Sequence, residues 1–195
     1  MKDPNTVLNT YVADMAAVEQ HIHDAITRQL DGDTMTQFPD ARRVTEELKS
    51  TLERHIATLK REHDSRDGGD FAEIIKKAVG SAMGAVAGLY DKVRTDKVSR
   101  MVRDNYTATS LAVISYHMLH TTALGLKNDR VADMALNHLR DLTPILVDLS
   151  QVVCSVVASE LANEDKIFDG TVGPQAVQNT QEAWSSSWLK TGSSV

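Results

Sequence analysis

The prolines of this chain constrain its fold more than any other feature. There are four, at positions 4, 39, 144 and 174, and they leave long tracts free of a residue that breaks a helix. Strand signals are nearly missing, because alternating apolar and polar runs bounded by tight turns do not occur and aromatic residues make up only 5% of the chain. The sequence therefore predicts an all-α protein.

Apolar residues recur every three or four positions in several tracts, which is the period of an amphipathic helix. Residues 5–30 and 40–65 each carry one such stripe, from Leu8 to Ala25 and from Val44 to Glu62. The rhythm returns in residues 129–161, where Pro144 should kink the helix or start a new one. For the helix predicted over 104–126 we expect the core positions Leu111, Ile114 and Met118.

Two segments differ from these tracts in composition. From about residue 71 the chain carries Gly80, Gly84 and Gly88, whose spacing by four allows close approach of another helix, and we expect a crossover helix here. A membrane-surface role for residues 74–94 is an alternative. Residues 165–195 are rich in small polar residues, and we expect an irregular tail that folds back or docks on a partner. The candidate contacts of this tail are Trp184, Trp188 and Leu189.

Charge and cysteine content exclude several classes of protein. The net charge is −6 and the pI is near 5.6, which argues against a nucleic-acid binder. The single cysteine, Cys154, lies in an apolar run and reads as a buried small hydrophobe, and it rules out a disulfide framework. The N-terminus lacks a signal-peptide core, and the apolar stretch 78–90 is too short to span a bilayer. We expect a cytoplasmic protein without membrane segments.

Polar residues interrupt the apolar stripes at a few positions. Glu19, His55 and His138 each occupy a stripe position on a different predicted helix, and Asp104 begins a further helix. Carboxylates and imidazoles that converge in this way are how a helical bundle builds a metal site. The four residues are therefore candidate ligands for a single iron, zinc or manganese ion.

A dinuclear iron centre demands more than this chain supplies. Such a centre takes a Glu from two helices and a Glu-x-x-His pair from each of the other two. Here Leu52 stands three residues before His55, and Ala135 stands three before His138. The remaining interpretations are a single ion, or a buried hydrogen-bonded network without a cofactor in which Glu19 partners an imidazole.

The helix order and several motifs resemble the ferritin-like superfamily, and within it the YciF-type bacterial stress proteins. The resemblance covers about residues 6–162 and rests on "DMAAVEQHI", "LERHIATLKRE", the glycine-containing crossover and "RDNYTATSLAVISYHML". It implies that Glu19 is the acid of the first helix, and that "HIATL" keeps His55 but has Ala57 and Thr58 where the family has acids. It also implies that "DNYT", residues 104–107, matches a Glu-His-Tyr-Glu-like tetrad of the family. In this match Tyr106 is retained and Asp104 stands in place of the first Glu.

The resemblance implies a ferritin-like four-helix bundle over residues 1–164 with a dismantled oxidase centre. Because no nucleophile elbow, Walker loop or dinucleotide motif is present, we expect a non-catalytic protein that acts through its surfaces. A homo-oligomer, with a dimer as the first choice, and a stress-related role fit this expectation. The alternatives are a metal-binding protein or oxidase with a reduced ligand set, and a cargo protein that docks into a protein compartment by its C-terminal tail.

Overall fold

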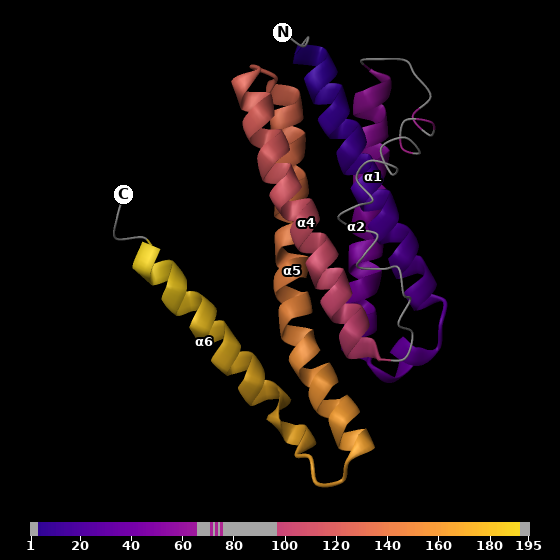
Figure 1. Cartoon of the computed structure of the whole chain (residues 1–195), viewed down its shortest axis with the longest axis vertical. Helices are drawn as coiled ribbons and strands as arrows, with labels where there is room; N and C mark the ends of the chain where they lie inside the picture. Colours follow the sequence, from indigo (N-terminus) through magenta and orange to yellow (C-terminus); the bar gives the residue numbers. More distant parts are fainter. Residues whose placement is uncertain (1–3, 66–70, 72, 74, 76–96, 192–195) are drawn as a thin grey trace.

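The computed structural model describes residues 4–65, 71, 73, 75 and 97–191, and within these the chain is all-helical, with no strand. Five helices pack against one another (Figure 1). They are α1 (Pro4–Leu30), α2 (Pro39–Asp64), α4 (Val98–Gly125), α5 (Asp129–Glu164) and α6 (Gly173–Thr191). The all-α prediction is confirmed. The expected crossover helix, with the glycines at 80, 84 and 88, lies outside the described residues.

Local signals in the sequence set several helix ends. Pro39 is the first residue of α2, a position where the missing N–H costs nothing and the fixed φ favours the helix. At the start of α5, the side chain of Asn128 accepts a hydrogen bond from the backbone N–H of Val131. Between α4 and α5 the chain reverses through Lys127, which has a left-handed φ of 55°. This tight reversal makes α4 and α5 antiparallel neighbours.

Side-chain contacts define the direction of each helix relative to its neighbours. α1 runs antiparallel to α2 and to α4, and α5 runs antiparallel to α2 and to α4. Glu19–His55 and His23–Glu53 join α1 to α2, and Glu19–Tyr116 and Gln29–Asn105 join α1 to α4. Glu62–Arg130 and Arg43–Asp148 join α2 to α5, and Tyr116–His138 and Lys97–Glu164 join α4 to α5. Consequently α2 ends near the start of α5, whereas α4 begins at the opposite end of the array (Figure 1).

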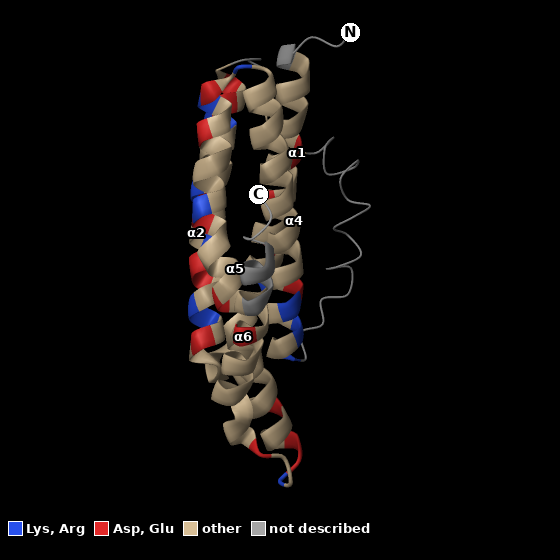
Figure 2. Cartoon of the chain, turned by 90° about the vertical axis from the view of Figure 1, so that its left-hand side faces the viewer, with Lys and Arg blue, Asp and Glu red and all other residues tan. Residues whose placement is uncertain are grey.

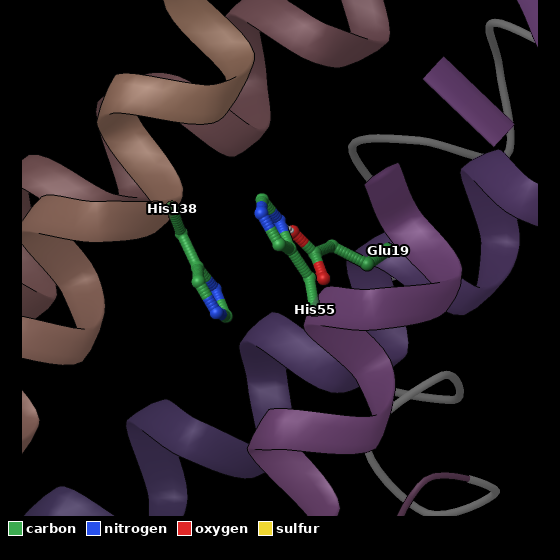
Figure 3. A group of neighbouring side chains, drawn as sticks. All are labelled: Glu19, His55 and His138. Carbon is green, nitrogen blue, oxygen red and sulfur yellow. Dashed lines mark hydrogen bonds and ion pairs between the residues drawn. The ribbon is translucent and has the colours of Figure 1, made fainter. Parts of the chain in front are cut away.

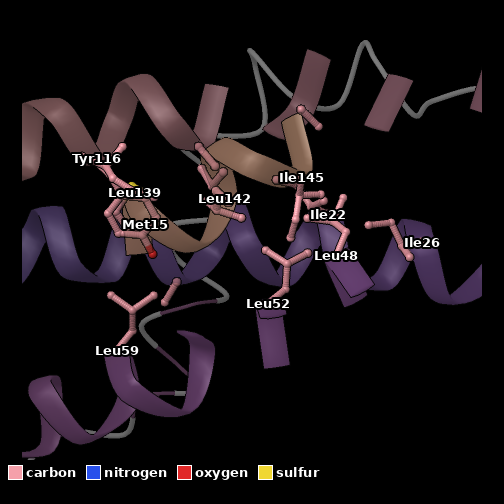
Figure 4. Packing of buried hydrophobic residues seen from close by; sticks show 14 of the residues in the cluster. Met15, Ile22, Ile26, Leu48, Leu52, Leu59, Tyr116, Leu139, Leu142 and Ile145 are labelled. Carbon is pink, nitrogen blue, oxygen red and sulfur yellow. The ribbon is translucent and has the colours of Figure 1, made fainter. Parts of the chain in front are cut away.

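A continuous apolar core lies between α1, α2, α4 and α5 (Figure 4). The stripes predicted on α1, α2 and α5 are largely buried, including Met15, Ile22, Leu48 and Leu142. Of the core positions predicted for α4, Leu111 is partly buried and packs against the core, whereas Ile114 and Met118 are wrong, because they are about half exposed, at 55% and 52%. α4 instead turns a face of small residues inward, with Ala108, Thr109, Ala112 and Ala123 buried around Tyr116 and Leu119. Small side chains allow helices to approach closely. Because alanine and threonine stand out little in hydrophobicity from the neighbouring residues of α4, the sequence pattern does not mark this face as buried.

α5 is the longest of the described helices. It continues through Pro144 without ending, so no new helix starts there. By length and composition α5 could cross a membrane, with a mean hydropathy of 1.7 over its most apolar window, although core helices of soluble proteins pass the same test. Only 22% of that window is buried within the chain.

The C-terminal segment is helical, so the expected irregular tail is wrong for residues 173–191. α6 starts in close contact with α5, where a Cβ added at Gly173 would lie 3.2 Å from the Cα of Ser155. From there α6 diverges from α5 towards its C-terminal end (Figure 1). Trp184 is 46% exposed, and the side chains of Trp188 and Leu189 lie outside the described residues.

Candidate functional site

Three of the predicted ligands meet in the core. Glu19 from α1, His55 from α2 and His138 from α5 are all buried, and one potential ligand atom of each lies within 4.8 Å of the others. In Figure 3, His55 lies between His138 and the carboxylate of Glu19. Each residue takes a stripe position on its helix, so the amphipathic period itself turns these polar groups inward.

Tyr116 of α4 joins the cluster as a fourth member. Its hydroxyl donates to Glu19 Oε1 at 2.8 Å and lies 2.6 Å from His138 Nδ1. A phenol has one hydrogen, and because Glu19 receives it, Nδ1 of His138 must donate to the phenol oxygen. In the neutral ring this leaves the other nitrogen, Nε2, with a lone pair.

His55 connects the buried carboxylate to one at the surface. Its Nδ1 lies 3.0 Å from Glu19 Oε1, and its Nε2 lies 3.2 Å from Oδ2 of Asp141. Both contacts are hydrogen bonds at once when both ring nitrogens carry hydrogen, or when one of the two carboxyl groups is protonated and donates to its nitrogen. Asp141 is also paired with Arg54 at 3.4 Å. The cluster therefore runs from a solvent-facing ion pair to a fully buried carboxylate.

Burial dominates the electrostatics of the cluster. It raises the pKa of Glu19, against the opposing effect of the hydrogen bond and charge of His55 and of the hydrogen bond from Tyr116. Burial and the adjacent Glu19 carboxylate raise the pKa of Tyr116 well above its usual value. Burial, with the charges of His55 and Arg54, lowers the pKa of His138 to about 3. At neutral pH, Tyr116 and His138 are thus uncharged.

The two imidazoles are stacked, and this bears on metal binding. Their ring centroids are 3.7 Å apart and the planes differ by 2°. An imidazole lone pair lies in the plane of its ring, so an ion cannot lie in the planes of two stacked rings at once. An ion shared by His55 and His138 requires at least one ring to turn away from the stack. Two iron ions do not fit the described residues, which bring only two carboxylates, Glu19 and Asp141, into contact with the histidines, whereas such a site takes about four.

Two features nonetheless suit one ion. The Oε2 atom of Glu19 is buried and has no hydrogen-bond partner among the described residues. A groove between α2 and α5 reaches the cluster, with His55, His138 and Asp141 among its lining residues. Glu19 Oε2 and a freed imidazole nitrogen would be the ligands, and the groove would be the route of entry.

Asp104, the fourth predicted ligand, does not join the cluster. It lies on α4, twelve residues before Tyr116, which is about 18 Å along a helix that rises 1.5 Å per residue. Its carboxylate is paired with Arg103 at 2.6 Å. The expectation that Asp104 shares an ion with Glu19 is therefore not supported by its position.

Sequence reasoning overlooked Tyr116 and Asp141. A Glu-x-x-His clamp has its acid three residues before the histidine, whereas Asp141 stands three residues after His138. That spacing also places both side chains on one face of the helix. Tyr116 belongs to the inward face of α4, whose many small residues hide it from the hydrophobic pattern of the sequence.

The comparisons with known proteins add no relative. No protein-family model, no curated protein and no solved structure matches this chain.

Proposed function

We propose that the protein is a ferritin-like four-helix-bundle protein without a dinuclear metal centre, which acts through its surfaces as a homo-oligomer or on a protein partner. The helix directions support the fold: α1, α2, α4 and α5 form antiparallel pairs, and α2 ends at the opposite end of the array from the start of α4. Ferritin-like bundles have one long crossover connection of this kind. A cytoplasmic, stress-related protein fits the proposal.

One observation carries the functional part. Glu19, His55, Tyr116 and His138 are bonded to one another in the core, and the two histidines are stacked rather than converging on a point. Apart from the unpartnered Oε2 atom of Glu19, this buried network makes its hydrogen bonds between its own members, and such a network fixes a particular core packing and needs no cofactor. Oxidase chemistry at two irons needs about four carboxylates, and the described residues give this cluster two, Glu19 and Asp141.

Iron oxidation tests the loss of the oxidase centre. Ferrous iron is added to the purified protein in air at neutral pH, and the formation of ferric iron is followed by absorbance. We expect the same rate as in buffer alone. A faster reaction that is lost in Glu19→Ala and kept in Asp104→Asn would contradict the proposal, because the second substitution lies about 18 Å from the cluster.

A single bound ion is the second candidate function, favoured by the unpartnered Oε2 atom of Glu19. Titration calorimetry with Zn²⁺ or Mn²⁺ tests it. Stoichiometric binding that disappears in Glu19→Ala and persists in Asp104→Asn would establish this candidate. The compartment-cargo alternative is weaker, because residues 173–191 form a helix against α5 and not a flexible linker with a peptide.

A further inference from the structure

The groove between α2 and α5 that reaches the polar cluster is large enough for a small organic molecule. Its volume of about 960 Å³ lies at the upper end of the roughly 300–1,000 Å³ of small-ligand sites. One ion pair crosses the groove from Arg54 of α2 to Asp141 of α5 at 3.4 Å. A second crosses it from Arg130 of α5 to Glu62 of α2 at 2.7 Å. Because Arg54 and Glu62 are eight residues apart on α2, the two ion pairs bound an opening about 12 Å long.

Within this opening, one charge of each sign has no ion-pair partner among the described residues. Arg61 of α2 donates to the carbonyl oxygen of Ala57 at 3.3 Å and to Oγ1 of Thr58 at 3.0 Å. A guanidinium has five N–H groups, so three of them remain free of any described acceptor. The carboxylate of Asp133 on α5 also lines the groove, and it has neither a hydrogen bond nor an ion pair with a described residue. The register set by the two ion pairs brings Asp133 within about one helical turn of Arg61, on the opposite wall.

The floor of the groove supplies a third group. His138 lines the groove, although the residue is only 4% exposed. Because Nδ1 of His138 donates to the oxygen of Tyr116, Nε2 carries the free lone pair. This Nε2 atom has no hydrogen-bond partner in the described part of the chain, and it is not one of the polar atoms sealed from solvent there. The groove therefore offers a largely buried acceptor beside the two free charges.

The two free charges favour a zwitterion over an ion of one sign. A net anion would meet Asp133 as well as Arg61, in a chain whose net charge is −6. A net cation would meet Arg61. Side chains of both signs lie along α2, one wall of the groove, so no large field of one sign attracts a polyanion or a polycation (Figure 2). A molecule with one positive and one negative group close together pairs with both free charges at once.

We infer that this groove binds a free α-amino acid whose side chain carries an N–H or O–H donor. The carboxylate pairs with Arg61, the ammonium group pairs with Asp133, and the side chain donates to Nε2 of His138. Asp133 and His138 are five residues apart on α5, a rise of about 7.5 Å, which an amino acid of the length of glutamine spans. Each contact uses a group that the described residues leave free, so binding breaks neither ion pair across the groove. The inference goes beyond the proposed surface function and does not depend on it.

Isothermal titration calorimetry of the full chain with L-glutamine tests the inference. The buffer contains EDTA, so that no metal ion bound at Glu19 attracts the ligand. We expect saturable binding of one molecule per chain. Glutaramate, which is glutamine without its ammonium group, and 4-aminobutanamide, which is glutamine without its carboxylate, should each bind at least about tenfold more weakly, because each leaves one charge unpaired. L-Alanine should also bind more weakly, because its side chain does not reach His138.

Substitutions at the two free charges test their roles without altering the core. Arg61→Gln and Asp133→Asn should each raise the dissociation constant for glutamine by at least about tenfold. Both residues are exposed, and circular dichroism verifies that each variant folds. Arg100→Gln and Glu182→Gln are the matched controls, because they make the same changes in net charge at exposed positions outside the groove. They should leave the dissociation constant unchanged.

The outcomes that would overturn the inference are specific. They are a lack of saturable glutamine binding, and equal binding by wild type, Arg61→Gln and Asp133→Asn. Tighter binding of glutaramate or of inorganic phosphate than of glutamine would identify an anion site and would overturn the zwitterion. Equal binding of alanine and glutamine would overturn the contact with His138. None of these results changes the iron-oxidation test of the proposed function, so the two can fail separately.

Discussion

His55 and His138 are stacked face to face, with their ring centroids 3.7 Å apart and their planes 2° from parallel. The stack is held from both sides: Glu19 and Asp141 contact the two nitrogens of His55, and Tyr116 contacts Nδ1 of His138. Hydrogen bonds therefore hold each ring in a specific orientation.

The low pKa of His138 makes stability depend on pH in a defined direction. The folded protein holds this ring neutral down to about pH 3, whereas the unfolded chain protonates it below about 6.5. Stability is therefore complete above pH 6.5 and falls as the pH drops towards 3. At pH 5 the loss from this residue is about 2 kcal/mol, from 1.5 pH units at about 1.36 kcal/mol each.

Urea denaturation of wild type and His138→Gln at several pH values measures this contribution. Glu19 works in the opposite sense, because its raised pKa makes the folded state bind a proton more readily as the pH falls. Both proteins retain Glu19, so the difference between their curves isolates His138. We expect the gap between wild type and variant to narrow as the pH falls from 6.5 to 4. A gap independent of pH would contradict the assignment.

Removal of the buried carboxylate should be more damaging than its neutralisation. Glu19→Leu leaves the Tyr116 hydroxyl and Nδ1 of His55 without an acceptor in a dry core, and we expect a loss of about 3–5 kcal/mol in the free energy of unfolding. Glu19→Gln keeps an acceptor oxygen and should cost about 1–3 kcal/mol. Denaturant titration measures both. A Leu variant as stable as wild type would mean that the cluster is not a coupled network.

The contact between α6 and α5 depends on a glycine. A Cβ added at Gly170 would lie 2.8 Å from the Cβ of Ala162, closer than packed carbon atoms approach, so Gly170→Ala should push the start of α6 away from α5. We expect a loss of about 1–3 kcal/mol and a shift in tryptophan emission, since both tryptophans lie in α6. Gly125→Ala is the control, because a Cβ there meets nothing within 4 Å. Equal effects of the two substitutions would rule out this packing.

The features that the sequence predicts well are those with strong periodicity. The stripes of α1, α2 and α5, and the inward positions of Glu19, His55 and His138, follow from the three-four spacing of large apolar residues. The same logic fails on α4, because alanines and a threonine make up much of the buried face there while Ile114 and Met118 face outward. Hydrophobicity alone ranks those outward residues above the inward ones.

Details of the cluster depend on three-dimensional relations that spacing alone does not encode. The sequence predicts Asp104 at the site because it begins a further helix and matches an acid of the family pattern, but the register of α4 puts Tyr116 there instead. Asp141 reaches His55 from another helix, 86 positions away in the chain. The stacking of two imidazoles from α2 and α5 is likewise a consequence of how these antiparallel helices meet.

The metal content of the protein tests the central claim most directly. The full chain is purified without a tag or chelator, and iron, zinc and manganese are measured by elemental mass spectrometry against protein concentration. The account predicts far less than one metal ion per chain, and the same low value in Glu19→Ala. Two iron ions per chain, lost in Glu19→Ala, would contradict it.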